Sequence, residues 1–224
     1  MRFKQIAIVL LVLLFPSLLY VIFSTGKHHI DKVQYFGPVT DSILYQVPEA
    51  TFLNYTGDSI STTDFESDIL VYNFFCTECS DSSARNVLLV KAINERFFDK
   101  KDIKYISINL TPSVWSKAAV TEYIRPFNTD KKQWFFVTAD SNYLSNFAEN
   151  GLLINSKYDS VGVAFKPGMA TIVIVDKQKH IRGFLDGNQY VDQSAIIDVI
   201  KRIRLEEYQK NAKRREDQFE RKRQ

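Results

Sequence analysis

Two cysteines stand three positions apart in this chain of 224 residues, and the chain has no others. They form the motif Cys76-Thr-Glu-Cys79, which follows the apolar run Asp68–Phe75 and precedes the polar cluster Ser80–Ser83. A helix that begins beside such a pair presents unpaired N–H groups and a partial positive charge, which stabilise a thiolate and lower its pKa. The spacing lets the two sulfurs close a small ring. The motif therefore predicts a redox-active thiol pair or a thiolate metal site.

A second interpretation of the same residues stays open. Cys76 fits a small buried apolar side chain at the end of a strand, with Cys79 alone exposed. Side chains alternate along a strand, so two residues three positions apart point to opposite faces unless the chain has already turned. A disulfide also requires Cα atoms within about 7 Å of each other. The geometry of this turn therefore decides between the two interpretations.

The composition limits what else the chain can do. It is 45% hydrophobic and 25% charged, which suits one domain with a real core. Two cysteines and three histidines are too few for a four-thiolate or histidine-rich metal site. Residues 201–224 hold ten Lys or Arg against five Asp or Glu, a local charge of +5, so the remaining 200 residues carry −2 of the total +3. The basic charge belongs to a tail, and we expect no nucleic-acid partner.

The N-terminus predicts a membrane anchor. Residues 6–23 contain no charged side chain and are rich in Leu, Val and Ile. This run is long enough for a helix that spans a membrane. A cleaved signal peptide is the alternative, but no A-x-A pattern follows the run. Arg2 and Lys4 precede it and place the N-terminus in the cytoplasm. The body is then extracytoplasmic, on the periplasmic side of the inner membrane in a bacterium, where a cysteine pair can oxidise.

The rest of the chain alternates between strand and helix patterns. We expect strands over 68–75, 103–109, 134–138, 171–176 and 180–185, an edge strand over 47–53, and helices ending near Phe98, over 113–124, over 141–150 and from about Asp192 into the tail. This order predicts an α/β fold with a mixed central sheet flanked by helices. The expected organisation is an anchor (1–24), a juxtamembrane linker (25–45), one domain (46–205) and a charged basic C-terminal helix or tail (206–224).

Several segments carry a family resemblance: Tyr35–Pro38, Val71–Phe75, Trp134–Thr138, Ile174–Lys177 and Ile181–Phe184. With the layout of anchor, linker and domain, they make the sequence resemble the SCO (SenC) family of membrane-anchored, thioredoxin-fold copper chaperones for cytochrome c oxidase. The resemblance covers about Val33–Ile200. It implies a thioredoxin-like fold and respiratory oxidase assembly proteins as partners.

The resemblance also implies a site, from which this chain departs. The family pattern F-F-x-T-x-C-P-x-x-C-P places the first family cysteine on Cys79 and the second on Ser83, while Cys76 takes a variable position. The family's copper-binding histidine falls on Gly168, and Ala170 stands where thioredoxin-type reductases have a cis-proline. Cys79 is thus the one copper ligand retained, and Cys76 is the candidate that joins it. His28, His29 and His180 are expected at the surface.

Three functions follow as hypotheses. The first is a thiol–disulfide or assembly-factor role in cytochrome c oxidase biogenesis, with Cys76 and Cys79 as the redox pair and the copper site largely lost. The second is a non-catalytic relative that uses the fold as a binding module. The third is a copper chaperone with an altered site made by Cys76 and Cys79, since soft Cu(I) prefers thiolates.

Overall fold

The computed structural model describes residues 11–21, 32–75, 81–109, 115–127, 132–154, 171–186, 193–221 and 223. Residues 1–31 and 32–224 form two compact units. In the first unit, residues 11–21 are helical and all of them are exposed. The described residues contain no helix with both the length and the apolar character that crossing a bilayer requires. The predicted span over 6–23 lies partly outside the described residues.

A seven-stranded mixed sheet forms the centre of the second unit, in the order β4-β3-β7-β6-β5-β8-β9. Strands β5, β6 and β7 are parallel, whereas β3, β4, β8 and β9 join by antiparallel pairing. The sheet strands are β3 (Thr51–Asn54), β4 (Ser59–Ser61), β5 (Ile69–Phe75), β6 (Ile103–Asn109), β7 (Trp134–Thr138), β8 (Thr171–Val175) and β9 (Ile181–Asp186); β1 (Val39–Thr40) and β2 (Ile43–Leu44) form a separate ribbon. The predicted α/β class with a mixed sheet is confirmed.

The predicted strands agree with the observed ones, with one correction. The bounds of β6 and β7 are those expected, β5 and β8 differ from expectation by one residue at one end, and β9 differs by one residue at each end. The strand expected over 47–53 is β3, which begins only at Thr51 and is not the sheet edge. The turn after Asn54 folds the chain back, so that β4 pairs outside β3 and becomes the edge strand.

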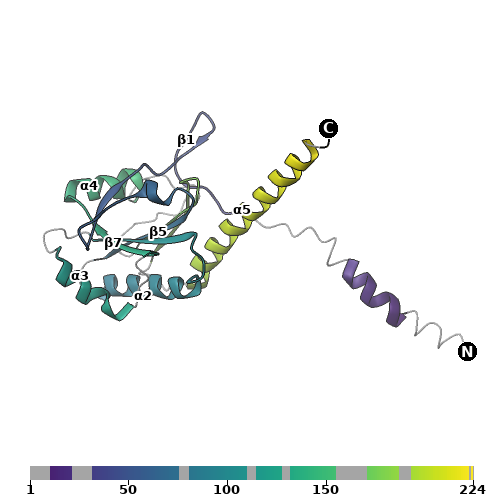
Figure 1. Ribbon diagram of the computed structural model, residues 1–224, viewed down its shortest axis with the longest axis horizontal. Coiled ribbons are helices and arrows are strands. Elements are labelled where there is room, and N and C mark those ends of the chain that lie inside the picture. The colour runs from purple at the N-terminus through teal and green to yellow at the C-terminus, as the bar shows by residue number, and fades with distance from the viewer. Residues whose placement is uncertain are drawn as a thin grey trace, which may run out of the picture. The chain divides into compact units, whose positions relative to one another are not determined.

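Helices cover both faces of the sheet. The helices are α2 (Asp81–Arg96), α3 (Lys117–Ile124), α4 (Ser141–Asn146, continued by a π-helical turn Phe147–Gly151) and α5 (Gln193–Arg221), with 3-10 turns at Thr62–Phe65 and Arg125–Phe127. Figure 1 shows α4 on one side of the sheet and α2 and α3 on the other. One core cluster joins Val71 and Phe75 of β5 to Val87, Val90 and the buried isoleucines of α5. A second core cluster on the opposite face includes Tyr72, Leu144 and Phe147.

The N-terminal arm, defined here as residues 32–36, is bound to the body by a buried arginine and by the Phe36 N–H, which donates to the Ile181 carbonyl at 3.0 Å. Arg182 of β9 pairs with Asp176 at 2.8 Å and with Glu206 of α5 at 2.6 Å. Its Nη2 donates to the carbonyl of Val33 at 2.7 Å, and its guanidinium lies 4.1 Å from the centre of the Tyr35 ring. Glu206 also accepts from the Val33 N–H at 2.5 Å. The arm, the sheet and α5 are therefore held at one point.

A second ionic cluster joins α5 to the start of β6. Asp102 pairs with Lys177 and with Arg204, each at 3.2 Å, and Lys177 also pairs with Glu207. Burial raises the pKa of Asp102, but the hydrogen bond and charge of Lys177 and the charge of Arg204 outweigh it and hold that pKa below its ordinary value. The carboxylate form is therefore favoured in the folded state.

The lowered pKa of Asp102 predicts a pH dependence of stability. The folded state binds this proton more weakly than the unfolded chain, so Asp102 stabilises the fold above the ordinary pKa of about 3.9. This contribution is lost as the pH falls through the lowered pKa. Comparing urea unfolding of the natural chain and Asp102→Asn from pH 6 to pH 2 checks it. The natural chain should be the more stable at pH 6, and the difference should close in acid; a constant difference contradicts the assignment.

Candidate functional site

Three strand ends lie together at the end of the sheet where β5 stops and the cysteine motif follows. Phe75 and Asn109 are paired at the carboxyl ends of the parallel strands β5 and β6. Strand β8 runs antiparallel to β5, with Asn73 opposite Ile172, so its first residue, Thr171, lies at the same edge. Phe75, Asn109 and Thr171 are fully buried. This edge is called the thiol edge below.

The predicted site residues adjoin the thiol edge in the chain. Cys76 follows Phe75 directly, and Cys79 precedes the first residue of α2 by two positions. Both cysteines, Gly168 and Ala170 lie outside the described residues. Ser83 is in the first turn of α2, and its side chain is not described. The pairing of Cys76 with Cys79 therefore stays a prediction.

Helix α2 is the helix that was expected directly after the cysteine motif. It has 16 residues and begins at Asp81, directly after the cysteine segment. Val87, Val90 and Ile93 are fully buried in the core cluster that includes Val71 and Phe75, so the helix is fixed against β5. Such a helix places the partial positive charge of its N-terminus beside the cysteine segment in sequence. This charge favours the thiolate form of a nearby cysteine.

A chain of buried polar groups crosses three strands beneath α2. Ser107 of β6 donates to Asn73 Oδ1 of β5 at 2.6 Å, and the Trp134 Nε1–H of β7 donates to Ser107 Oγ at 2.8 Å. The Nδ2 of Asn73 is buried and has no hydrogen-bond partner among the described residues. Asn73 shares a face with Val71 and Phe75, two positions before the strand ends.

This chain of buried polar groups was not predicted from the sequence. One residue pointed to it, because Asn73 interrupts the otherwise apolar run Ile69–Phe75. A buried polar side chain in such a run needs a partner, but the sequence does not name it. The partners come from two other strands, Ser107 and Trp134, and only the pairing order of the sheet reveals them.

Removing the central hydroxyl tests the polar chain. Ser107→Ala leaves the Trp134 Nε1–H and the side-chain Oδ1 of Asn73 buried without that partner. The free energy of unfolding should therefore fall by about 1–3 kcal/mol. Urea unfolding measures the loss. Ser67→Ala, at an exposed turn, is the control and should change stability by less than about 0.5 kcal/mol. Equal effects of the two substitutions contradict the role of Ser107.

Among the described residues, the histidines and acids offer no alternative site. His180 was expected at the surface, but it is half-buried, and its Nδ1 lies 2.8 Å from the carbonyl oxygen of Tyr45. Its backbone N–H also donates to Asp176. His28 and His29 lie outside the described residues. Within the described residues, no group of three or more His, Cys, Asp or Glu side chains is placed to hold a metal ion.

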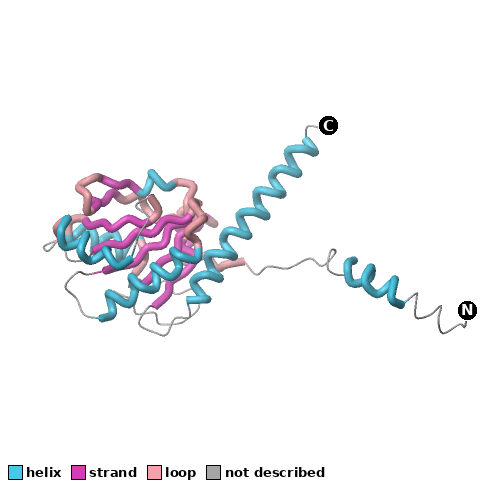
Figure 2. Tube along the Cα trace, turned by 60° about the horizontal axis from the view of Figure 1, so that its bottom comes forward, coloured by secondary structure: helices cyan, strands magenta, loops and turns pink. Residues whose placement is uncertain are grey.

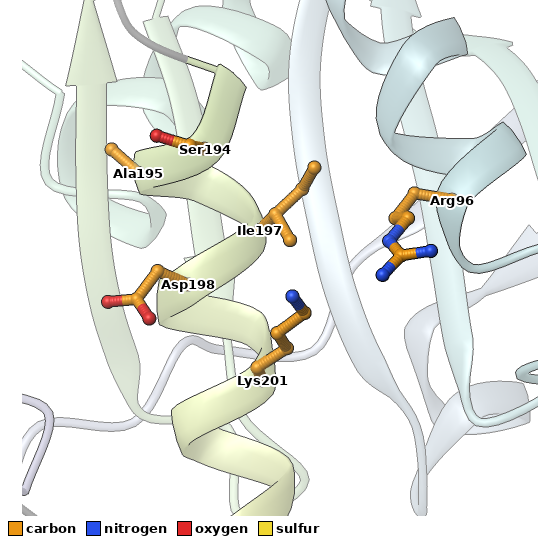
Figure 3. A pocket seen from close by; sticks show the side chains of 6 residues that line it. All are labelled: Arg96, Ser194, Ala195, Ile197, Asp198 and Lys201. Atoms are coloured by element: carbon orange, nitrogen blue, oxygen red, sulfur yellow. The ribbon is translucent and has the colours of Figure 1, made fainter.

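A groove of about 500 Å³ lies between the last turn of α2 and the start of α5 (Figure 3). Arg96 and Lys201 point into it from the two helices. Asp198 forms an ion pair with Arg202 at 2.7 Å. The described residues of its lining include one hydroxyl, Ser194, and no histidine or cysteine.

The comparisons with known proteins address the fold. No protein-family model matches this chain, and no curated protein matches it. Among solved structures, an SCO1/SenC family lipoprotein from Bacillus anthracis is similar with a TM-score of 0.59 at 17% identity, over 71% of this chain and 95% of that one. The chain has the fold of the SCO proteins. BsSco, a member of the Sco family of cytochrome c oxidase assembly proteins, also has a TM-score of 0.59, at 16% identity over 72% of this chain and 95% of its own.

A third neighbour with the SCO fold carries a metal. ScoI of Arabidopsis thaliana, solved with copper bound, has a TM-score of 0.53 at 15% identity, over 72% of this chain and 99% of that one. The structural neighbours are thus the proteins that the sequence segments resembled, and the expected fold is confirmed.

Proposed function

We propose that this chain is a membrane-anchored, extracytoplasmic SCO-type protein that acts by thiol–disulfide chemistry or as an assembly factor in cytochrome c oxidase biogenesis. The observation that carries the proposal is the SCO fold with the motif Cys76-Thr-Glu-Cys79 between its buried strand β5 and helix α2. A neighbour of the same fold, BsSco, is described as having a disulfide switch. In this proposal Cys79 is the thiol nearest the helix and Cys76 is its partner.

Counting thiols tests the redox pair. The full chain, purified without reductant, should have no free thiol and should gain two after reduction, measured by the mass added by a maleimide reagent. The matched controls are Cys76→Ser and Cys79→Ser, each of which should show one thiol with or without reductant. Two free thiols in the unreduced natural chain would overturn the disulfide and favour the non-catalytic binding module.

A copper role is the second candidate, favoured by the copper-bound neighbour with the same fold. The donor set fits only in part: the two thiolates suit soft Cu(I), but Gly168 has no side chain and the Ser83 hydroxyl is a hard ligand. Copper would then be cargo held by Cys76 and Cys79. Competition titration of the reduced chain with a Cu(I) chelator decides. Binding by the natural chain no tighter than by Cys79→Ser rejects this candidate.

The anchor rests on the uncharged run at residues 6–23 and on the exposed apolar side chains of the helix over 11–21. When the full chain is expressed in a bacterium with two membranes, it should stay in the membrane pellet after an alkaline carbonate wash. Its intact mass should include Met1, and protease added to spheroplasts should digest the body. Release of the chain with its N-terminal run removed would instead identify a cleaved signal.

A further inference from the structure

Only the first part of helix α5 is buried against the body. Its buried residues are Ile196, Ile200 and Ile203, all in the first 11 of its 29 positions. The described ion pairs between α5 and the rest of the body end at Glu207. From Tyr208 to Arg221 every residue is exposed. Lys210 and Arg214 line a pocket with Ser67 and Gln178 of the body, and Figures 1 and 2 show the C-terminal end of the helix standing clear of the sheet and its helices. Residues 208–221 are called the helix extension below.

The helix extension and the turn that precedes it present an apolar stripe to solvent. The stripe consists of Leu205, Tyr208, Ala212 and Phe219, which lie within about 60° of one another on an α-helix. Leu205 is 41% exposed, Tyr208 72% and Phe219 70%. Isolated exposed apolar residues are ordinary, but an aligned row that includes two aromatic side chains is typical of a surface with a partner.

The charge of the helix extension indicates which kind of partner it binds. The helix extension contains five Lys or Arg and three Asp or Glu, and Lys222 and Arg223 follow it, whereas residues 1–200 carry a net charge of −2. Within the described part of the chain, none of the cations of the helix extension forms an ion pair with the body. An excess of positive charge beside exposed Tyr and Phe side chains complements the anionic headgroups and interface of a bilayer.

The position at which α5 leaves the body also favours a bilayer as the partner. The N-terminal arm is bound at Glu206, two residues before the helix extension. From Phe23, the end of the apolar run, to Val33 the chain reaches at most about 35 Å. From Glu206 to Arg221 the helix is about 22 Å long. If the run is the anchor, the helix extension begins where the tether from the membrane ends and lies within reach of the headgroups.

We propose that the helix extension of α5 docks on the surface of a bilayer that contains anionic lipids. This inference rests on the anchored topology of the proposed function. The arm, Asp102 and Lys177 are at the edge where β5 and β6 begin, and the thiol edge is at the other end of these strands, about 20 Å away. Docking the helix extension thus turns the thiol edge away from the bilayer, toward soluble partners.

Hydrogen exchange of the full chain in vesicles tests this docking. The chain is reconstituted in phosphatidylcholine alone and in phosphatidylcholine with phosphatidylglycerol. Amide exchange in residues 208–221 should be slower by about tenfold or more in the anionic vesicles. The triple variant Lys210→Gln, Arg214→Gln, Arg221→Gln should lose this difference. The control triple variant Lys101→Gln, Lys117→Gln, Arg125→Gln removes the same charge from elsewhere on the body and should keep it.

Two outcomes overturn the docking. Equal exchange in neutral and anionic vesicles rejects it, and protection that rises with the number of chains per neutral vesicle identifies a second copy of the chain as the partner. The anchor is tested separately by flotation. A chain that fails to float with neutral vesicles lacks the anchor, whereas a chain that floats with them but shows no effect of anionic lipid lacks only the docking.

Discussion

Replacing Arg182 with alanine is expected to lower the free energy of unfolding by about 3–5 kcal/mol, because it leaves buried carboxylates without their counter-charge. The Arg182 side chain is 3% exposed, its partner Asp176 is 1% exposed, and Glu206 is 16% exposed. The loss also removes the hydrogen bond to the Val33 carbonyl, so the N-terminal arm should detach before the sheet unfolds. Urea unfolding measures the change in the free energy of unfolding. Hydrogen exchange of residues 33–36 shows whether the arm has detached.

An exposed arginine on α5 provides the control. Arg202 pairs with Asp198 at 2.7 Å, but the two side chains are 46% and 53% exposed. Arg202→Ala should therefore cost about 0–1 kcal/mol. If Arg182→Ala costs no more than Arg202→Ala, or leaves exchange in the arm unchanged, the buried cluster does not hold the arm, the sheet and α5 together.

Replacing Phe75 with alanine is the second substitution with a large expected effect. Phe75 is fully buried, and its ring stacks on Tyr123 at 5.2 Å and meets Phe136 edge-on at 5.5 Å. Loss of the ring removes apolar burial and leaves a cavity, which should cost about 3–5 kcal/mol in the free energy of unfolding. Phe75 also precedes Cys76, so the substitution loosens the point from which the cysteine segment leaves the sheet.

Phe98→Ala is the matched control, because that ring is 63% exposed. It should change the free energy of unfolding by less than about 1 kcal/mol. Thiol reactivity gives a second measurement: in the reduced chain, the rate of alkylation at Cys76 and Cys79 should change for Phe75→Ala and stay the same for Phe98→Ala. Equal unfolding free energies for the two variants would contradict the packing assigned to Phe75.

Local pattern predicted most of the elements. The runs Ile103–Asn109 and Trp134–Thr138 are strands with the bounds expected, because β-branched and aromatic residues in a row suit a pleated strand buried on both faces. The hairpin of β8 and β9 was also expected, with its turn after Asp176. The β4 edge was missed because its three residues carry little apolar pattern, and their pairing with β3 alone makes them a strand.

Buried polar partners could not be predicted in the same way. Arg182 and Glu206 are 24 positions apart, and both would pass as surface residues in a sequence that is 25% charged. Their pairing depends on how α5 docks beside β9. Ser107 and Trp134 become partners of Asn73 because β6 lies between β5 and β7. The same limit applied to His180, which is half-buried because the chain before β3 passes over its hairpin.

The linear pattern of side chains was enough to predict the α/β class, most of the strands and helices, and the position of Cys76 and Cys79 between a buried strand and a helix. These depend on side chains within a few positions of one another, which the linear order records. The tertiary structure alone decided the edge strand, the partners of the buried polar groups and the docking of the N-terminal arm at Glu206. It also decided that the helix extension leaves the body at the edge opposite the thiol edge. Those features depend on which distant elements pack together, and burial then makes each unpaired charge or hydrogen-bonding group too costly to leave without a partner.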